Sequence, residues 1–130
     1  MPYTTWGESS PHPNMNKDKL HKIIRKFADQ EPNENIYKFG LCSEFAVALK
    51  RFLKSGTIYK AGLMHTALKW KNYYCDITGC LNKDRFQFRN PSTSLSPATK
   101  EEITHINNLL DHKEVDRIHK ALTKISRRVK

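Results

Sequence analysis

Apolar side chains near the start of the chain recur at intervals of three and four residues, which is the spacing of an amphipathic helix. The stripe predicts a helix that begins after Asn16 and ends near Gln30, before Pro32. A polar turn then leads to the short apolar segment IYKFG. The stripe of this first helix consists of Leu20, Ile23, Ile24 and Phe27.

The segment CSEFAVALKRFLKSG predicts a second helix that begins at Cys42. Gly56 is expected to end it, because glycine adopts the left-handed conformation of a helix C-terminus at little cost. Cys42 therefore lies in or beside the first turn of the helix. The apolar face of this helix consists of Phe45, Ala48, Leu49 and Phe52.

After Gly56 the pattern changes to an alternation typical of β-strands. The segment TIYKAGLMHTALKW predicts one or two strands, and YYCDIT predicts another after a turn at Lys71 and Asn72. Because side chains alternate between the faces of a sheet, this turn places one largely apolar face opposite a face that carries His65 and Asp76. In this register Asp76 is diagonal to His65, within reach of a long side chain.

The last third of the chain combines turn residues with two helix signals. The segment RFQFR, residues 85–89, favours a short strand. Thr99 and Glu102 form a capping box that predicts a helix ending near Leu110, and Asp111 opens a final helix. The apolar face of the final helix consists of Ile118, Leu122 and Ile125.

These elements predict a single α+β domain over residues 17–130, because a chain of 130 residues has room for one core. The helix carrying Cys42 is expected to pack on a small antiparallel sheet, with further helices at both ends of the chain. Residues 1–16 contain three of the six prolines and no basic residue, so we expect a flexible leader there.

The charge balance changes the picture of partners. The chain has 23 Lys and Arg against 13 Asp and Glu, a net charge of +10. This favours an acidic protein, a nucleic acid or a nucleoprotein as partner, whereas no apolar run approaches the length needed to cross a membrane. The oligomeric state stays open. The residues expected to bind the anionic partner are Lys113, Arg117, Lys120, Lys124, Arg127 and Arg128.

Cysteine usage indicates a reducing, cytoplasmic compartment, because three cysteines are an odd number and too few for a disulfide framework. The start of the chain also lacks the pattern of a secretory signal. Cys75 and Cys80, with Cys42 and His65, are an alternative zinc site, but the spacing lacks the paired motifs of zinc ligands. We therefore expect no metal and no organic cofactor.

The candidate chemistry centres on Cys42. A thiol at a helix N-terminus feels the partial positive charge of the helix, and a nearby imidazolium lowers its pKa further. His65 would accept the thiol proton and return it to a leaving group, and Asp76 would orient the imidazole. The oxyanion would be stabilised by the backbone N–H of Cys42 and by a second donor, Asn35 or Tyr37.

The order GLCSEFAVAL, MHTALKW and YYCDITG resembles the compact core of papain-like and transglutaminase-like cysteine enzymes. In those families the nucleophile opens a helix, and the His and Asp or Asn lie on successive strands. The resemblance covers roughly residues 36–80, and Ser43 stands where papain-type proteases commonly have tryptophan. It implies acyl transfer through a thioester: hydrolysis of an amide or ester, or transfer to an amine.

A different class of protein stays open beside this one. A small basic binding protein or inhibitor, of the kind that phages and mobile elements encode, would bind nucleic acid or a nucleoprotein without chemistry. In that case the region around Cys42 is scaffold, and the cationic tail from Lys113 onward is the functional surface. Salt dependence of nucleic-acid binding distinguishes the two classes, because phosphate contacts weaken steeply with salt.

Overall fold

The computed structural model describes residues 15–62, 65–89 and 94–129. The predicted flexible leader therefore lies outside the described residues except at its end. There Met15 is buried in the core, and the Asn16 side chain caps the first helix by accepting a hydrogen bond from the N–H of Lys19 at 2.9 Å. These two residues belong to the folded domain.

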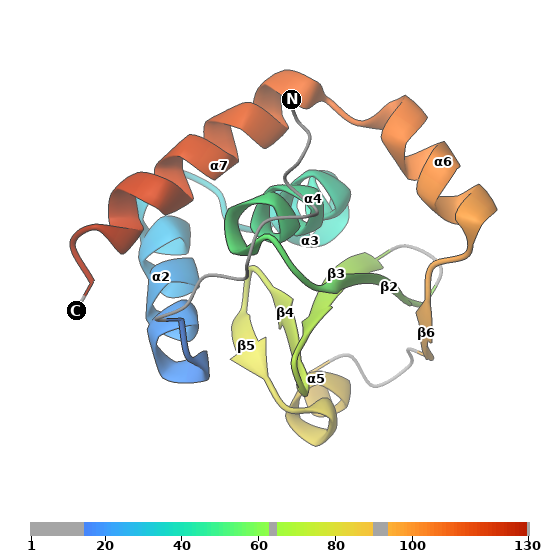
Figure 1. Cartoon of the computed structure of the whole chain (residues 1–130), viewed down its shortest axis with the longest axis horizontal. Helices are drawn as coiled ribbons and strands as arrows, with labels where there is room; N and C mark the ends of the chain where they lie inside the picture. The colour runs from blue at the N-terminus through green and yellow to red at the C-terminus, as the bar shows by residue number, and fades with distance from the viewer. Residues whose placement is uncertain (1–14, 63–64, 90–93, 130) are drawn as a thin grey trace.

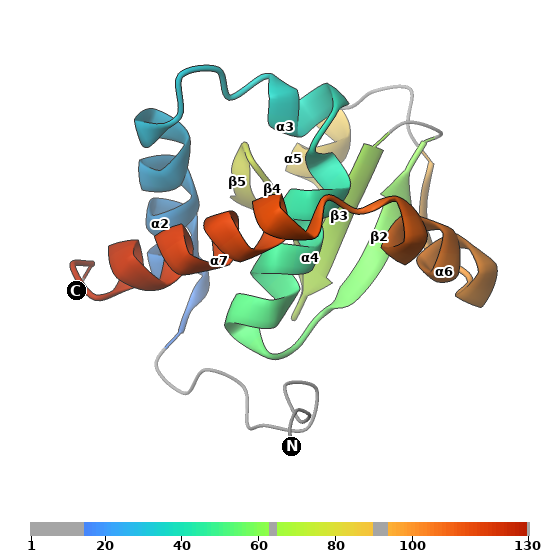
Figure 2. The same cartoon turned by 90° about the horizontal axis from the view of Figure 1, so that it is seen from above.

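Within the described residues the chain forms an α+β fold with six helices and one five-stranded antiparallel sheet of order β5-β4-β3-β2-β6. Helices α2 and α4 cover one face of the sheet, and α7 packs across these two helices. Helix α5 covers the other face of the sheet (Figures 1 and 2). The helices are α2 (Lys17–Gln30), α3 (Ile36–Phe39), α4 (Cys42–Leu53), α5 (Lys83–Arg89), α6 (Lys100–Leu109) and α7 (His112–Ser126). The strands are β2 (Thr57–Ala61), β3 (His65–Trp70), β4 (Tyr73–Asp76), β5 (Gly79–Leu81) and β6 (Leu95–Pro97).

The predicted first and second helices are confirmed as α2 and α4, and their apolar stripes are buried together in the main core. The predicted end of α4 is wrong in one detail. Lys54, and not Gly56, takes the left-handed position at the helix C-terminus, with φ 59°. Gly56 has φ 112° in the link to β2, where a Cβ would meet the Leu68 side chain at 2.9 Å. Glycine is thus required there by close packing against β3.

The predicted hairpin is confirmed with its register: Trp70 is paired with Tyr73 and Leu68 with Cys75. The face that carries Leu68 and Cys75 packs into the main core under α2 and α4. The opposite face is not solvated, because α5 covers it. Its buried cluster consists of Ala61, Ala67, Tyr74, Leu81 and Phe86.

The prediction of a strand at residues 85–89 is wrong, since this segment belongs to α5. The Asn82 side chain accepts a hydrogen bond from the N–H of Arg85 at 2.9 Å, which is the geometry of a helix N-cap. Phe86 then points onto the sheet and is fully buried. The alternation of basic and aromatic residues in so short a segment fitted either structure.

The two C-terminal helices begin where the capping signals predicted. Thr99 and Glu102 form the capping box of α6, and the Asp111 side chain accepts hydrogen bonds from the first turn of α7. The carboxylate of the buried Glu44 accepts the N–H of Asp111 at 2.9 Å and so joins α4 to the start of α7. Among the described residues, no helix combines the length and the apolar character that a membrane crossing needs.

Candidate active site

Cys42 is the first residue of α4, with 8% of its surface exposed. The amides in the first turn of a helix have no partner within the helix, so this position carries a partial positive charge. The neighbouring Ser43 hydroxyl lies 3.0 Å from the hydroxyl of Thr66 on β3. This contact fixes the start of α4 against the strand that begins with His65.

His65 and Asp76 are in contact, as the hairpin register predicted. His65 Nε2 lies 2.9 Å from Asp76 Oδ2, and the carboxylate is buried. Its other oxygen, Oδ1, accepts the backbone N–H of Thr78 at 2.9 Å and the Thr78 hydroxyl. These bonds form an Asx-turn at the end of β4, which fixes the carboxylate in the orientation that faces the imidazole.

The second ring nitrogen of His65 faces the helices. Nδ1 lies 3.3 Å from the carbonyl oxygen of Lys38 in α3, the short helix that leads into α4, and the ring stacks on Phe86 at 6.5 Å. The Asp76 carboxylate and the Lys38 carbonyl can only accept hydrogen bonds. The surroundings therefore suit a ring that carries protons on both nitrogens.

The pKa values of His65 and Cys42 shift in opposite directions. Burial lowers the pKa of His65, but the hydrogen bonds and charges of Asp76 and Cys42 outweigh it and raise the pKa to about 9. Burial raises the pKa of Cys42, but its hydrogen bonds to His65 and to the Thr66 backbone outweigh it and lower the pKa below the ordinary value. Both shifts stabilise a thiolate beside an imidazolium relative to the neutral pair.

The two predicted oxyanion donors lie in different surroundings. The backbone N–H of Tyr37 donates to Glu34 at 3.1 Å, and its hydroxyl is hydrogen-bonded to Glu31 and Arg117. Tyr37 therefore has its donors turned to other partners, and the structure does not support it as the second donor. Asn35 lines a polar pocket beside the cluster, and its role stays a prediction.

The predicted anion-binding residues, which lie on α7 and directly after it, also divide into two groups. The Arg117 guanidinium contacts Glu31 at 2.8 Å and Glu114 at 3.0 Å, so it joins α7 to the end of α2 and is not a free cation. The remaining five residues are exposed, and their role in binding stays a prediction. They are Lys113, Lys120, Lys124, Arg127 and Arg128.

Cys75 and Cys80 are paired with each other and lie on the apolar face of the hairpin. They are opposed across β4 and β5, their Sγ atoms are 3.0 Å apart, and both side chains are buried. In the described parts of the chain, no group of three or more metal-ligating side chains could hold an ion. Burial raises the pKa of the Cys75 thiol well above its ordinary value, so this pair is chemically unlike Cys42.

Sequence reasoning missed Lys38 and Thr78, which complete the surroundings of the cluster. Thr78 follows Asp76 by two residues, the spacing of an Asx-turn, and that pattern could have revealed it. Lys38 contributes a backbone carbonyl to the ring of His65, and a carbonyl leaves no signal in a sequence.

Comparison with protein-family models finds no match to this chain. Comparisons with curated proteins and with solved structures likewise find no match. What can be said about function therefore comes from the geometry of the cluster. A thiol of lowered pKa at a helix N-terminus, next to an imidazole that a buried carboxylate holds, has the components of a nucleophile that attacks an electrophilic carbon.

Proposed function

We propose that the chain is a thiol-dependent hydrolase or acyltransferase that acts on an amide or a related acyl bond. One observation carries the proposal: His65 is held by Asp76 at 2.9 Å through Nε2 and is also hydrogen-bonded to the thiol of Cys42 at the start of α4. A buried carboxylate, an imidazole and a thiol in contact are the components of a cysteine nucleophile with its base and its orienting group.

The reaction follows from the protonation states. The Cys42 thiolate attacks the acyl carbon, and the carbonyl electrons move to the oxygen, where the backbone N–H of Cys42 is the proposed donor. The His65 imidazolium then protonates the leaving amine or alcohol as its bond to carbon breaks, which leaves a thioester on Cys42. Water or an amine attacks the thioester next, and His65 accepts its proton. Asp76 stabilises the imidazolium at each stage.

The proposal includes a papain-like or transglutaminase-like core. The order of elements supports it: the nucleophile opens α4, and the histidine and the aspartate follow on the antiparallel neighbours β3 and β4. Because α4 packs on β3, the first residue of the helix meets the first residue of the strand.

The proposal also includes an anionic partner: an acidic protein, a nucleic acid or a nucleoprotein. The exposed basic residues on α7 and directly after it would recruit this partner. The supporting observation is a net charge of +10 with these side chains at the surface. A salt titration of binding to generic duplex and single-stranded nucleic acid tests the nucleic-acid case, because phosphate contacts give a steep loss of affinity with salt.

Labelling by a haloacetamide tests whether Cys42 is an activated nucleophile. Cys42 should be labelled faster than an ordinary thiol, and His65→Ala should slow it, whereas Cys75 and Cys80 serve as internal references because they are buried. His105→Ala, an exposed histidine on α6, is the matched control and should leave the rate unchanged. If Cys42 reacts as slowly as an unactivated thiol and His65→Ala changes nothing, the proposal fails.

Acyl chemistry is tested with an activated ester. Incubation should add one acyl group to Cys42, detected as a mass shift on the peptide that contains it, followed by its loss to water or to an added amine. Cys42→Ser should abolish the transient adduct, and His65→Ala should slow both its formation and its loss. Faster release with an amine than with water alone would identify a transferase. A stable adduct, or none, would count against acyl turnover.

A further inference from the structure

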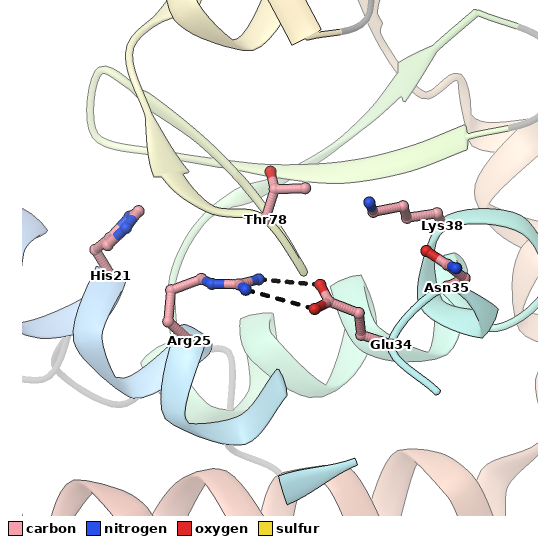
Figure 3. A pocket seen from close by; sticks show the side chains of 6 residues that line it. All are labelled: His21, Arg25, Glu34, Asn35, Lys38 and Thr78. Carbon is pink, nitrogen blue, oxygen red and sulfur yellow. Dashed lines mark hydrogen bonds and ion pairs between the residues drawn. The ribbon is translucent and has the colours of Figure 1, made fainter. Parts of the chain in front are cut away.

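A polar pocket of about 500 Å³ lies beside the catalytic cluster, between α2, α3 and the turn that joins β4 to β5. This volume is within the range of pockets that enclose a small molecule or a side chain. The residues that line it are His21, Arg25, Glu34, Asn35, Lys38 and Thr78, all shown in Figure 3.

The pocket shares residues with the cluster. The Lys38 carbonyl oxygen lies 3.3 Å from His65 Nδ1, and the Thr78 hydroxyl donates to the carboxylate of Asp76. The same two residues line the pocket, where the Lys38 side chain extends from α3 toward Thr78 (Figure 3). A group bound in this pocket would therefore lie next to the His65–Asp76 pair.

The charges in the pocket do not cancel. The Arg25 guanidinium is paired with Glu34 at 3.1 Å and also donates to the Ile77 carbonyl at 2.9 Å, so these two side chains neutralise each other. His21 accepts the N–H of Cys80 through Nδ1 at 3.0 Å, which requires an unprotonated nitrogen and hence a neutral ring. Lys38 remains as the unbalanced positive charge of the lining.

The Lys38 ammonium, carried by α3, and the side-chain amide of Asn35, the residue before α3, both lie at one side of the pocket (Figure 3). In the described part of the chain, neither group makes a hydrogen bond or an ion pair, although the charge of Lys38 contributes to the lowered pKa of Glu34. Lys38 is half-buried and Asn35 is exposed. An ammonium beside an amide offers a point charge and a neutral donor. This pair matches one carboxylate.

We infer that this pocket is a subsite for an acidic side chain of a protein substrate, with Lys38 as the residue that determines the specificity. The inference rests on the proposed function, because it assumes that an acyl substrate reaches Cys42. The carboxylate would pair with the Lys38 ammonium and accept a hydrogen bond from Asn35, while the Glu34–Arg25 ion pair closes the other side. This arrangement would direct the enzyme to amide bonds that lie near Asp or Glu residues.

The test uses two affinity labels that differ in one charge, haloacetyl-glutamate amide and haloacetyl-glutamine amide. Each is made with and without a glycine between the haloacetyl group and the amino acid, so that its side chain lies at two different distances from Cys42. The measurement is the second-order rate of Cys42 labelling. The acidic reagent should react faster in the wild type by about two- to fivefold, the range of a single half-exposed ion pair, and added salt should reduce the preference. Lys38→Ala should remove the preference, and Lys38→Glu should reverse it.

Lys100→Glu is the matched control, because it makes the same change in net charge at an exposed position on α6, outside the pocket lining and outside the proposed anion-binding residues. The preference should survive in this variant. Equal rates for the two reagents in the wild type, or equal loss of the preference in both charge variants, would overturn the subsite while leaving Cys42 reactive. Slow labelling by both reagents that His65→Ala does not change would overturn the proposed function, and the subsite with it.

Discussion

Replacement of Asp76 by asparagine tests the electrostatics of the cluster without changing its shape. In the native chain one carboxylate oxygen faces His65 Nε2 and the other accepts the N–H of Thr78. An asparagine has only one oxygen. If that oxygen stays with Thr78, its NH₂ group points at Nε2 and forces the ring proton onto Nδ1, where it blocks acceptance of the thiol proton.

The size of the effect can be estimated from the structure. The pKa of His65 is raised from an ordinary 6.5 to about 9, and one pKa unit corresponds to about 1.4 kcal/mol. Its neighbours therefore outweigh burial and favour the imidazolium by a net of about 3–4 kcal/mol. Without the carboxylate, burial disfavours the charged ring, and Cys42 loses its counterion. Near pH 6 an ordinary thiol is only about 0.3% ionised, although its thiolate is the stronger nucleophile. These opposing effects leave a net loss of labelling rate of about tenfold or more in the Asp76→Asn variant.

The assay is the second-order rate of haloacetamide labelling at Cys42 between about pH 5 and pH 9, with quantification by mass spectrometry. As the pH falls, the wild type should keep more of its rate than the variant, and the two rates should converge only near the alkaline end. Asp84→Asn, an exposed carboxylate on α5, makes the same charge change and should behave as the wild type. Identical profiles for wild type and Asp76→Asn, in a variant that circular dichroism shows to be folded, would refute the reasoning.

Three further predictions concern the fold. Lys54→Gly should raise the free energy of unfolding by about 1 kcal/mol in urea denaturation, because Lys54 has φ 59°, a left-handed conformation that glycine adopts more easily. Lys26→Gly, in the interior of α2, should lower the free energy of unfolding by about 1 kcal/mol. Equal effects of the two substitutions would contradict the left-handed conformation of Lys54. Phe86→Ala should lower the free energy of unfolding by about 3–5 kcal/mol, because the Phe86 ring is fully buried between α5 and the sheet. A loss below about 1 kcal/mol would argue against that packing. Arg117→Ala should lower the free energy of unfolding by about 1 kcal/mol in thermal denaturation, because it removes partly exposed ion pairs to Glu31 and Glu114. Arg128→Ala, at an exposed position, should leave the free energy of unfolding almost unchanged. A larger loss in Arg128→Ala than in Arg117→Ala would contradict the position of α7.

The parts of the fold that could be predicted depend on local patterns. The helices α2, α4 and α7 each have an apolar stripe, and a capping residue marks the start of α2, α6 and α7. The hairpin at Lys71 and Asn72 has strict alternation on both sides, so its register, and with it the contact between His65 and Asp76, could be predicted. A one-residue slip would have separated the two side chains.

The elements that could not be predicted depend on the rest of the chain. Strands β5 and β6 have three residues each and exist through pairing with β4 and β2, which leaves almost no pattern in so short a segment. Residues 85–89 form α5 because Asn82 caps them and Phe86 finds a place on the sheet. The partners of Tyr37 came from α2 and α7, segments whose packing the sequence does not reveal.

The proposed function requires that the folded chain holds Cys42 as a thiolate beside a protonated His65. Titration of the thiolate ultraviolet absorbance, taken as the difference between wild type and Cys42→Ser, measures this directly. Because the pKa of Cys42 is lowered and that of Cys75 is raised, the midpoint of the difference signal should lie below pH 8.5, about the pKa of an ordinary thiol. A signal from Cys42 that develops only at or above that pH would contradict the account.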